Sequence, residues 1–360
     1  MLVAHGGSKA CKQYHGGSGS MIYRTFVKDF ESHTEPFVIG DLDASKSFVH
    51  VLDDTTLDIL MSERDTIVDF TKYLSKREAF LRSGVEVISA GEEELLTFYL
   101  KNLNTEGEHD FVLPKSENKA NILALVEGNW EAFQRNPQRL AQKKENEISY
   151  SWDKIIEKFA HHAVHGTQYK KSTHGLGGTE TSLRFLASES RFMRRILSIA
   201  IYDMLRRTAE NQRMIRIVPS DSIEGLHYVF LLFPFPKQPP NITQEEYRAV
   251  REKYLEATCM VARLNDPQIK HIVGFSTETG ITSNRSEDLL YFDCANWTLE
   301  IEENAKKNQI ELGILTKASQ YNFHVAEYPE IEDEVPHKKT QRNNLCPCGS
   351  GLKYKKCHGK

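Results

Sequence analysis

The chain has 360 residues, of which 39% are hydrophobic and 10% aromatic, and its formal net charge is −4. This length and apolar fraction allow one large or two medium domains and exclude a largely disordered chain. The small net charge provides no overall attraction to nucleic acid or to an anionic membrane, so any such affinity must come from a local cluster of charges.

The sequence contains no candidate membrane-spanning segment. Its longest apolar run, residues 228–233, ends at Pro234 and is far shorter than the ~20 residues that a spanning helix needs. The N-terminus lacks the apolar core of a secretory signal, so we expect a cytoplasmic protein whose cysteines stay reduced. Three of the six cysteines are isolated and three lie in the last fifteen residues, a clustering typical of a metal site.

Residues 1–20 contain the sequence His-Gly-Gly-Ser twice. This composition is typical of a flexible segment, so we treat residues 1–20 as a flexible leader outside the folded body. Residues 21–133 mix short apolar runs with amphipathic stretches and are predicted to form an N-terminal α+β region. Its expected elements are strands at 37–40, 48–52 and 109–113 and helices at 64–82, 91–103 and 118–133.

The polar segment 134–149 is predicted to be a linker, and residues 150–326 to form a second α/β region. The clearest helix start is Thr243 followed by Glu246, the pattern of a capping box. Because strands alternate with helices, we expect an α/β or α+β layered body with a mixed sheet. The expected elements are helices at 152–165, 179–210, 243–262 and 297–308 and strands at 226–233, 271–276, 288–293 and 310–315.

The end of the chain predicts a small zinc site. Residues 327–344 are acidic, then basic, and contain prolines, so we expect a charged linker that buries no core. Within residues 345–360, eight residues separate a Cys-x-Cys pair from a Cys-His pair, and a Gly-Ser-Gly sequence between them allows the chain to reverse. Structural zinc takes four such ligands tetrahedrally. The predicted ligands are Cys346, Cys348, Cys357 and His358.

This tail resembles the SEC-C motif, the zinc-binding element at the C-terminus of the preprotein translocase motor ATPase. The similarity extends over residues 346–359 and includes Pro347, Tyr354 and the two lysines after it. The resemblance implies a zinc-stabilised SEC-C tail that docks on a protein partner, a chaperone or the ribosome. It does not imply a motor, because the sequence has no G-x-x-x-x-G-K-[ST] phosphate loop.

The predicted helix 179–210 is rich in arginine. At helical spacing Arg184, Arg191 and Arg195 share one face, and arginine forks suit phosphate groups, so this face is a candidate nucleic-acid contact. Nearby acids such as Glu180 offer the alternative of ordinary ion pairs within the helix. The tail adds cations of its own that could contact phosphate: Lys353, Lys355 and Lys356.

Four further patterns favour structural explanations. Glu157, His161 and His165 share a helix face, but their spacing is not that of a zinc-protease helix, so a solvated face is the simpler interpretation. The glycine-rich loop 174–178 lacks the preceding strand of a phosphate-binding loop and is predicted to be a connection. Asp65, Asp69, Lys72 and Lys76 are predicted to form the solvated side of helix 64–82 rather than a nuclease site, and Cys259 and Cys294 to be buried thiols.

Two functions remain open. In the first, the protein is a zinc-binding adaptor whose SEC-C tail binds a protein partner or nucleic acid. In the second, it is an enzyme acting on nucleic acid or a phosphorylated substrate, with the arginine-rich helix as its binding surface and the zinc tail for targeting. The sequence identifies no catalytic residue for either.

Overall fold

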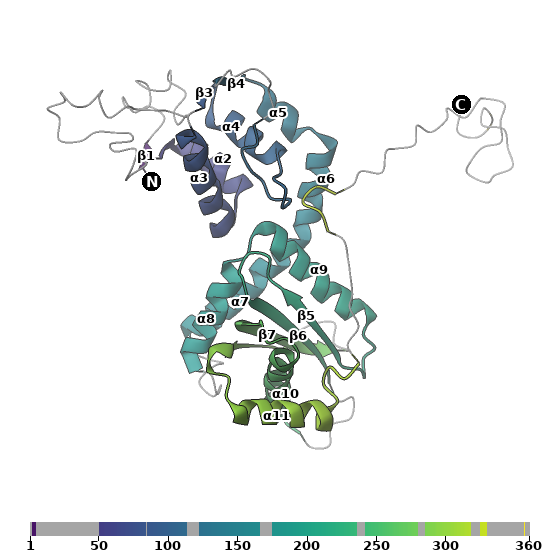
Figure 1. The fold of residues 1–360 in the computed structure, drawn as a ribbon. Coiled ribbons are helices and arrows are strands. Elements are labelled where there is room, and N and C mark those ends of the chain that lie inside the picture. The colour runs from purple at the N-terminus through teal and green to yellow at the C-terminus, as the bar shows by residue number, and fades with distance from the viewer. Residues whose placement is uncertain are drawn as a thin grey trace.

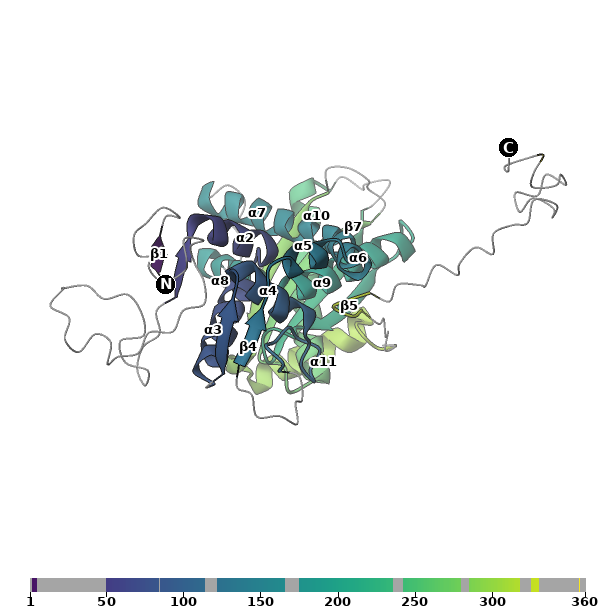
Figure 2. The same ribbon diagram turned by 90° about the horizontal axis from the view of Figure 1, so that it is seen from above.

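The computed structural model describes residues 2–4, 50–83, 85–113, 122–165, 175–235, 242–279, 285–317, 325–329 and 356. Within these ranges the chain forms an N-terminal lobe, built from β1 to α5, and a C-terminal lobe, built from α7 to α11, with α6 between them (Figure 1). Seen from above, the N-terminal lobe projects over the C-terminal lobe (Figure 2). None of the helices in the described part of the chain has the length and apolar composition needed to cross a membrane.

The N-terminal lobe combines four helices with two small parallel sheets. Helix α3 begins where Thr66 caps it, accepting a hydrogen bond from the backbone N–H of Asp69 at 3.0 Å. Tyr73, Leu96 and Tyr99 are fully buried between the helices. The elements are β1 (Leu2–Ala4), β2 (Val51–Asp53), α2 (Asp54–Glu63), α3 (Ile67–Arg82), β3 (Glu86–Ser89), α4 (Glu92–Lys101), β4 (Ile122–Leu125) and α5 (Asn129–Gln134); β1 pairs with β2 and β3 with β4.

The C-terminal lobe is a four-stranded mixed sheet covered by helices on both faces. Its order is β5-β6-β7-β8, with β6 and β7 parallel and the two outer pairs antiparallel. Its elements are α7 (Tyr150–His165), α8 (Gly175–Ala187), α9 (Arg191–Arg207), β5 (Met214–Pro219), β6 (Leu226–Pro234), α10 (Gln244–Asn265), β7 (His271–Thr279), β8 (Glu287–Asp293), the short turn η3 (Cys294–Asn296) and α11 (Leu299–Leu312).

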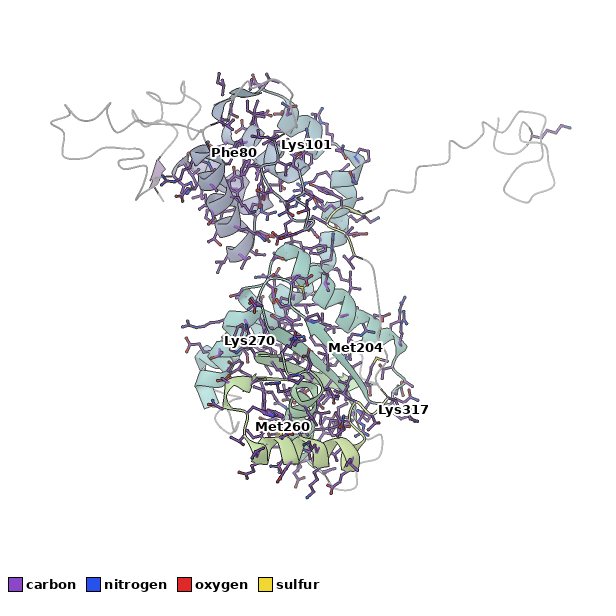
Figure 3. The ribbon with its side chains drawn as sticks, viewed as in Figure 1. Phe80, Lys101, Met204, Met260, Lys270 and Lys317 are labelled. Carbon is purple, nitrogen blue, oxygen red and sulfur yellow. The ribbon has the colours of Figure 1, made fainter. Side chains whose placement is uncertain are left out.

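Strand β6 shows why both faces are covered. Its side chains alternate between two buried clusters, with Tyr228 and Phe230 facing α7, α8 and α9, and Val229 and Leu231 facing α10. A strand buried on both sides appears in the sequence as a continuous apolar run. Figure 3 accordingly places Met204 of α9 and Met260 of α10 on opposite sides of the sheet.

The prediction of a mixed-sheet body is confirmed, and the elements at 64–82, 91–103, 152–165, 226–233, 243–262, 271–276, 288–293 and 297–308 are found with shifts of a few residues at their ends. Cys259 and Cys294 are buried as expected. The capping box is present, since Thr243 N donates to Glu246 Oε2 at 2.7 Å and Glu246 N donates to Thr243 Oγ1 at 3.2 Å.

Several predicted elements are wrong. Residues 118–133 are not one helix, because residues 122–125 form β4 and the helix α5 begins at residue 129. Residues 109–113 contribute a single bridge residue, His109, and residues 310–315 end α11 rather than form a strand. Strands β1, β3 and β5 and helix α2 were not predicted, and the polar segment 134–149 contains α6 (Pro137–Asn146) and η2 (Glu147–Ser149). The strand expected at 37–40 lies outside the described residues.

The predicted helix 179–210 is divided in two by a specific break. Helix α8 ends at Ala187 and α9 begins at Arg191, with the Ser190 hydroxyl accepting from Met193 N at 3.1 Å as the new cap. Between them Glu189 is fully buried and accepts hydrogen bonds from Ser220 Oγ and Tyr228 Oη, both at 2.7 Å. This anchoring to the sheet turns the chain, so helical spacing does not continue across the break.

Candidate functional site at the cleft between the lobes

A cavity of about 610 Å³ lies where the two lobes meet. Its wall combines the turn between α2 and α3, the loop after α4, helix α6 and the start of α9, and both acidic and basic side chains face it. Elements far apart in the sequence therefore form one polar cleft. The charged side chains on its wall are Glu63, Arg64, Asp65, Asp69, Lys72, Glu106, Glu108, Arg139, Lys143, Glu147, Arg191, Asp221 and Glu327.

Arg191, the first residue of α9, joins the lobes on one side of the cleft. Its guanidinium donates to both carboxylate oxygens of Asp65 at 2.9 and 2.8 Å and to Asp153 Oδ2 at 2.7 Å. It also lies over the Tyr150 ring, 4.4 Å from the centroid, while its backbone N–H donates to Asp69 Oδ2 at 2.7 Å. Burial disfavours the charge, but these carboxylates outweigh it and raise the pKa of Arg191. The residue is thus a fixed structural cation.

The short segment 325–329, which we call the latch, lies on the other side of the cleft, beside α6 (Figure 1). The Glu327 carboxylate accepts a hydrogen bond from Gln142 Nε2 at 2.6 Å and lies 3.1 Å from His109 Nε2. Arg195 Nη2 donates to the carbonyl oxygens of Ala326 and Glu327, the latter at 3.3 Å. Tyr328 donates its hydroxyl to the Leu100 carbonyl and packs edge-on against His109, with ring centroids 5.7 Å apart.

Latch and body neutralise each other's charges. Burial would raise the pKa of Glu327, but the hydrogen bond and charge of His109, together with the charges of Arg195 and Arg64, lower it to about 2. Burial lowers the pKa of Arg195, and Glu327 opposes this effect. The prediction that the linker begins at Glu327 and buries nothing is therefore wrong for Glu327 and Tyr328, which are partly buried; the Glu327 side chain keeps 14% of its surface exposed.

Among the described residues, the buried polar atoms without a hydrogen-bond partner include Tyr99 Oη and His109 Nδ1, beside the latch. Both residues line the cavity, and burial raises the pKa of Tyr99 to about 12, so its hydroxyl stays protonated at neutral pH. A buried hydroxyl or ring nitrogen without a partner costs free energy, so these atoms favour a polar occupant in the cleft.

The three arginines predicted to share one face do not share it. Arg184 lies on α8, is exposed, and pairs with Glu180 at 2.7 Å, which confirms the alternative of an ordinary pair within the helix. Arg191 is held in the pairs at the cleft, and the Arg195 side chain is fully buried beside the latch. A phosphate contact by these three residues stays a prediction, and the break before α9 separates Arg184 from the other two.

The zinc ligands predicted in the tail lie outside the described residues, as do Lys353 and Lys355; Lys356 is described and exposed. Within the ranges that the structure describes, no group of three or more histidine, cysteine or acidic side chains is arranged to hold a metal ion. His161 is exposed on α7, while His174 and the side chains of His165 and of residues 175–178 are not described. Residues 175–178 form the first turn of α8 and not the predicted loop.

The acidic and basic residues of α3 are not a solvated face throughout. Asp69 is buried, where it accepts from Arg64 at 2.9 Å and from the Thr66 hydroxyl at 2.7 Å. Lys72 and Lys76 pair with acids of the loop after α4. The prediction of a solvated face is therefore wrong for Asp69, which Arg64, Thr66 and the backbone N–H of Arg191 contact in a way that the helix pattern cannot indicate.

Comparison with known proteins identifies one segment. The SEC-C motif matches residues 342–360. The protein translocase subunit SecA of Geotalea uraniireducens is 53% identical over 38 residues, 11% of this chain and 4% of that protein, and SecA of Campylobacter concisus is 64% identical over 31 residues, 9% and 4%. SecA of Vesicomyosocius okutanii is 30% identical over 121 residues, 32% and 12%.

This chain thus spans only 4 to 12% of the length of these three translocase subunits, and no solved structure matches it. The resemblance seen in the sequence is confirmed and is limited to a segment. Residues 342–360 are a SEC-C motif attached to the two-lobed body described above.

Proposed function

We propose that this protein is a cytoplasmic zinc-binding adaptor whose SEC-C tail binds a protein partner. The observation that carries the proposal is the SEC-C match over residues 342–360, which include all four predicted ligands. Three thiolates and one imidazole form a common structural zinc set. The residues that would hold the ion are Cys346, Cys348, Cys357 and His358.

Zinc supplies the tail with stability that its own side chains cannot. A segment of this size has too few apolar residues for a core, and metal binding contributes on the order of 10–16 kcal/mol to the folding of small zinc peptides. Lys353, Lys355 and Lys356 lie between the two ligand pairs and favour the thiolate forms of the cysteines. The folded tail presents these cations to its partner.

The partner is proposed from the relatives. They are protein translocase subunits, and the SEC-C resemblance implies docking on a chaperone or on the ribosome. Nucleic-acid binding through the tail lysines is the alternative for this interaction. An enzyme acting on nucleic acid or a phosphorylated substrate receives less support, because Arg191 and Arg195 are engaged by carboxylates and by the latch.

The test is elemental analysis of the full chain combined with partner capture. We expect about one zinc ion per wild-type chain, none in Cys346→Ser, and an unchanged content in the matched control Cys11→Ser. In capture from a cell extract, a partner should be lost with Cys346→Ser and retained with Cys11→Ser. Absence of stoichiometric zinc from the wild-type protein would refute the metal assignment, and identical partners for both variants would refute the adaptor role.

A further inference from the structure

We propose that the cleft between the lobes is a receptor site for a short acidic peptide with an aromatic residue after the acid, and that residues 325–329 occupy it in cis. The proposal is independent of zinc and of the tail's partner. It begins from the occupant that the structure shows, a glutamate-tyrosine pair seated on side chains from both lobes.

The receptor recognises the acid by charge and by hydrogen bonds. Glu327 Oε1 faces Gln142 Nε2 at 2.6 Å and His109 Nε2 at 3.1 Å, and the Arg64 and Arg195 charges act on the same carboxylate. Arg195 has no exposed side-chain surface, and its guanidinium pairs with Glu145 at 3.4 Å and donates to the latch. A buried arginine needs counter-charge and acceptors nearby, and without the latch Arg195 keeps Glu145, which is 48% exposed, but loses the Glu327 charge and two carbonyl acceptors.

The receptor also recognises the backbone and the aromatic ring. Arg195 Nη2 donates to two successive carbonyl oxygens, at residues 326 and 327, which fixes the direction of the bound segment. Tyr328 packs against the apolar cluster of the N-terminal lobe and donates its hydroxyl to the Leu100 carbonyl. Different groups of the body thus contact the carboxylate, the backbone and the aromatic ring of the latch, as in a peptide-binding site rather than in a single ion pair.

The latch is a short segment that contacts several elements of the body. Its partners lie on α4, on the loop after α4, on α6 and on α9, and the contacts to His109 and Gln142 join residues 218 and 185 positions apart. A tethered occupant competes with free peptide at an effective concentration on the order of millimolar. A peptide in trans therefore binds well only when the latch is weakened.

The direct test uses a fluorescein-labelled peptide with the sequence of residues 324–330, His-Val-Ala-Glu-Tyr-Pro-Glu, and the full chain. By fluorescence anisotropy we expect the variant Glu327→Ala/Tyr328→Ala to bind this peptide at least tenfold more tightly than the wild type. Changing the first glutamate of the peptide to glutamine should weaken binding to the variant about tenfold. Adding His109→Ala to the double variant should weaken its binding of the glutamate peptide by a similar factor. Adding the control substitution Glu303→Ala, at an exposed residue, should leave this binding unchanged.

The proposal would be overturned if the folded double variant did not bind the peptide, or if it bound the glutamine peptide as tightly as the glutamate peptide. If the double variant fails to fold, the single variant Glu327→Gln decides by hydrogen exchange. We expect faster exchange in residues 100–111 and 142–149 than in the wild type and unchanged exchange in β6 and β7. Equal exchange in all of these segments would equally overturn the proposal.

Discussion

Replacing Arg191 by alanine should weaken the contact between the lobes more than replacing any exposed arginine by alanine does. The change removes a two-pronged pair with Asp65, a pair with Asp153 and the stacking on Tyr150. Breaking a buried pair costs about 3–5 kcal/mol and an exposed pair contributes about 0.2–1 kcal/mol. The side chains of Arg191, Asp65 and Asp153 are 11%, 25% and 31% exposed, so we expect an intermediate loss of about 2–3 kcal/mol.

Scanning calorimetry measures this loss as a fall of about 3–4 °C in melting temperature, since an unfolding entropy of about 2.1 cal/mol/K per residue makes 1 kcal/mol correspond to about 1.3 °C in a chain of 360 residues. Arg184→Ala is the matched control, because within the described part of the chain Arg184 pairs with Glu180, and both side chains are largely exposed, at 77% and 65%. It should shift melting by less than about 1 °C. Arg191→Lys keeps the charge but loses the planar guanidinium, so its melting temperature should lie closer to that of Arg191→Ala than to that of the wild type. Equal shifts for the alanine variants at positions 184 and 191 would refute the assignment of Arg191 as the connection between the lobes.

Three further predictions concern charge. The pKa of Glu327 is lowered from 4.5 to about 2, so its carboxylate stabilises the fold fully above about pH 4.5. This contribution, roughly 3 kcal/mol at most, is lost as pH falls toward 2. The free energies of unfolding of the wild type and Glu327→Gln, measured in urea, should therefore differ at pH 6 and converge near pH 2. Arg251→Ala removes the cation that pairs with the buried Glu278 and one of the two that pair with Asp288, the other being Arg248, and should cost about 3–5 kcal/mol by urea unfolding at pH 7. Binding to single-stranded DNA should weaken steeply with salt only when the tail lysines are present, so a Lys353→Ala/Lys355→Ala variant with unchanged affinity would contradict tail contact with phosphate.

Local signals allowed much of the fold to be predicted. The capping box at Thr243 and the apolar run of β6 each depend on residues adjacent in the sequence, and both elements are found where expected. Strand β4 was missed for the opposite reason. Its sequence, Ile-Leu-Ala-Leu, suits a strand or a buried helix equally, and only its pairing with β3 decides between them.

The cleft could not be predicted, because its key contacts are distant in sequence. Glu327 follows no motif and precedes a run of acids and prolines, so its composition indicated a linker. Its hydrogen-bond partners lie more than a hundred residues away. The arginine face failed for a related reason: helical spacing assumes one continuous helix, and the buried Glu189 interrupts it through contacts with the sheet.

The latch also determines how far the SEC-C motif can reach from the body. With residues 325–329 seated, the connection to the motif at residue 342 starts at residue 330 and can extend at most about 40 Å. With the latch released, the connection starts after Lys317, and the limit rises to about 80 Å. A partner held by the motif is therefore confined near the cleft while the latch is seated. Because a peptide that displaces the latch also frees the motif, the receptor site and the SEC-C motif are coupled by the length of the chain between them.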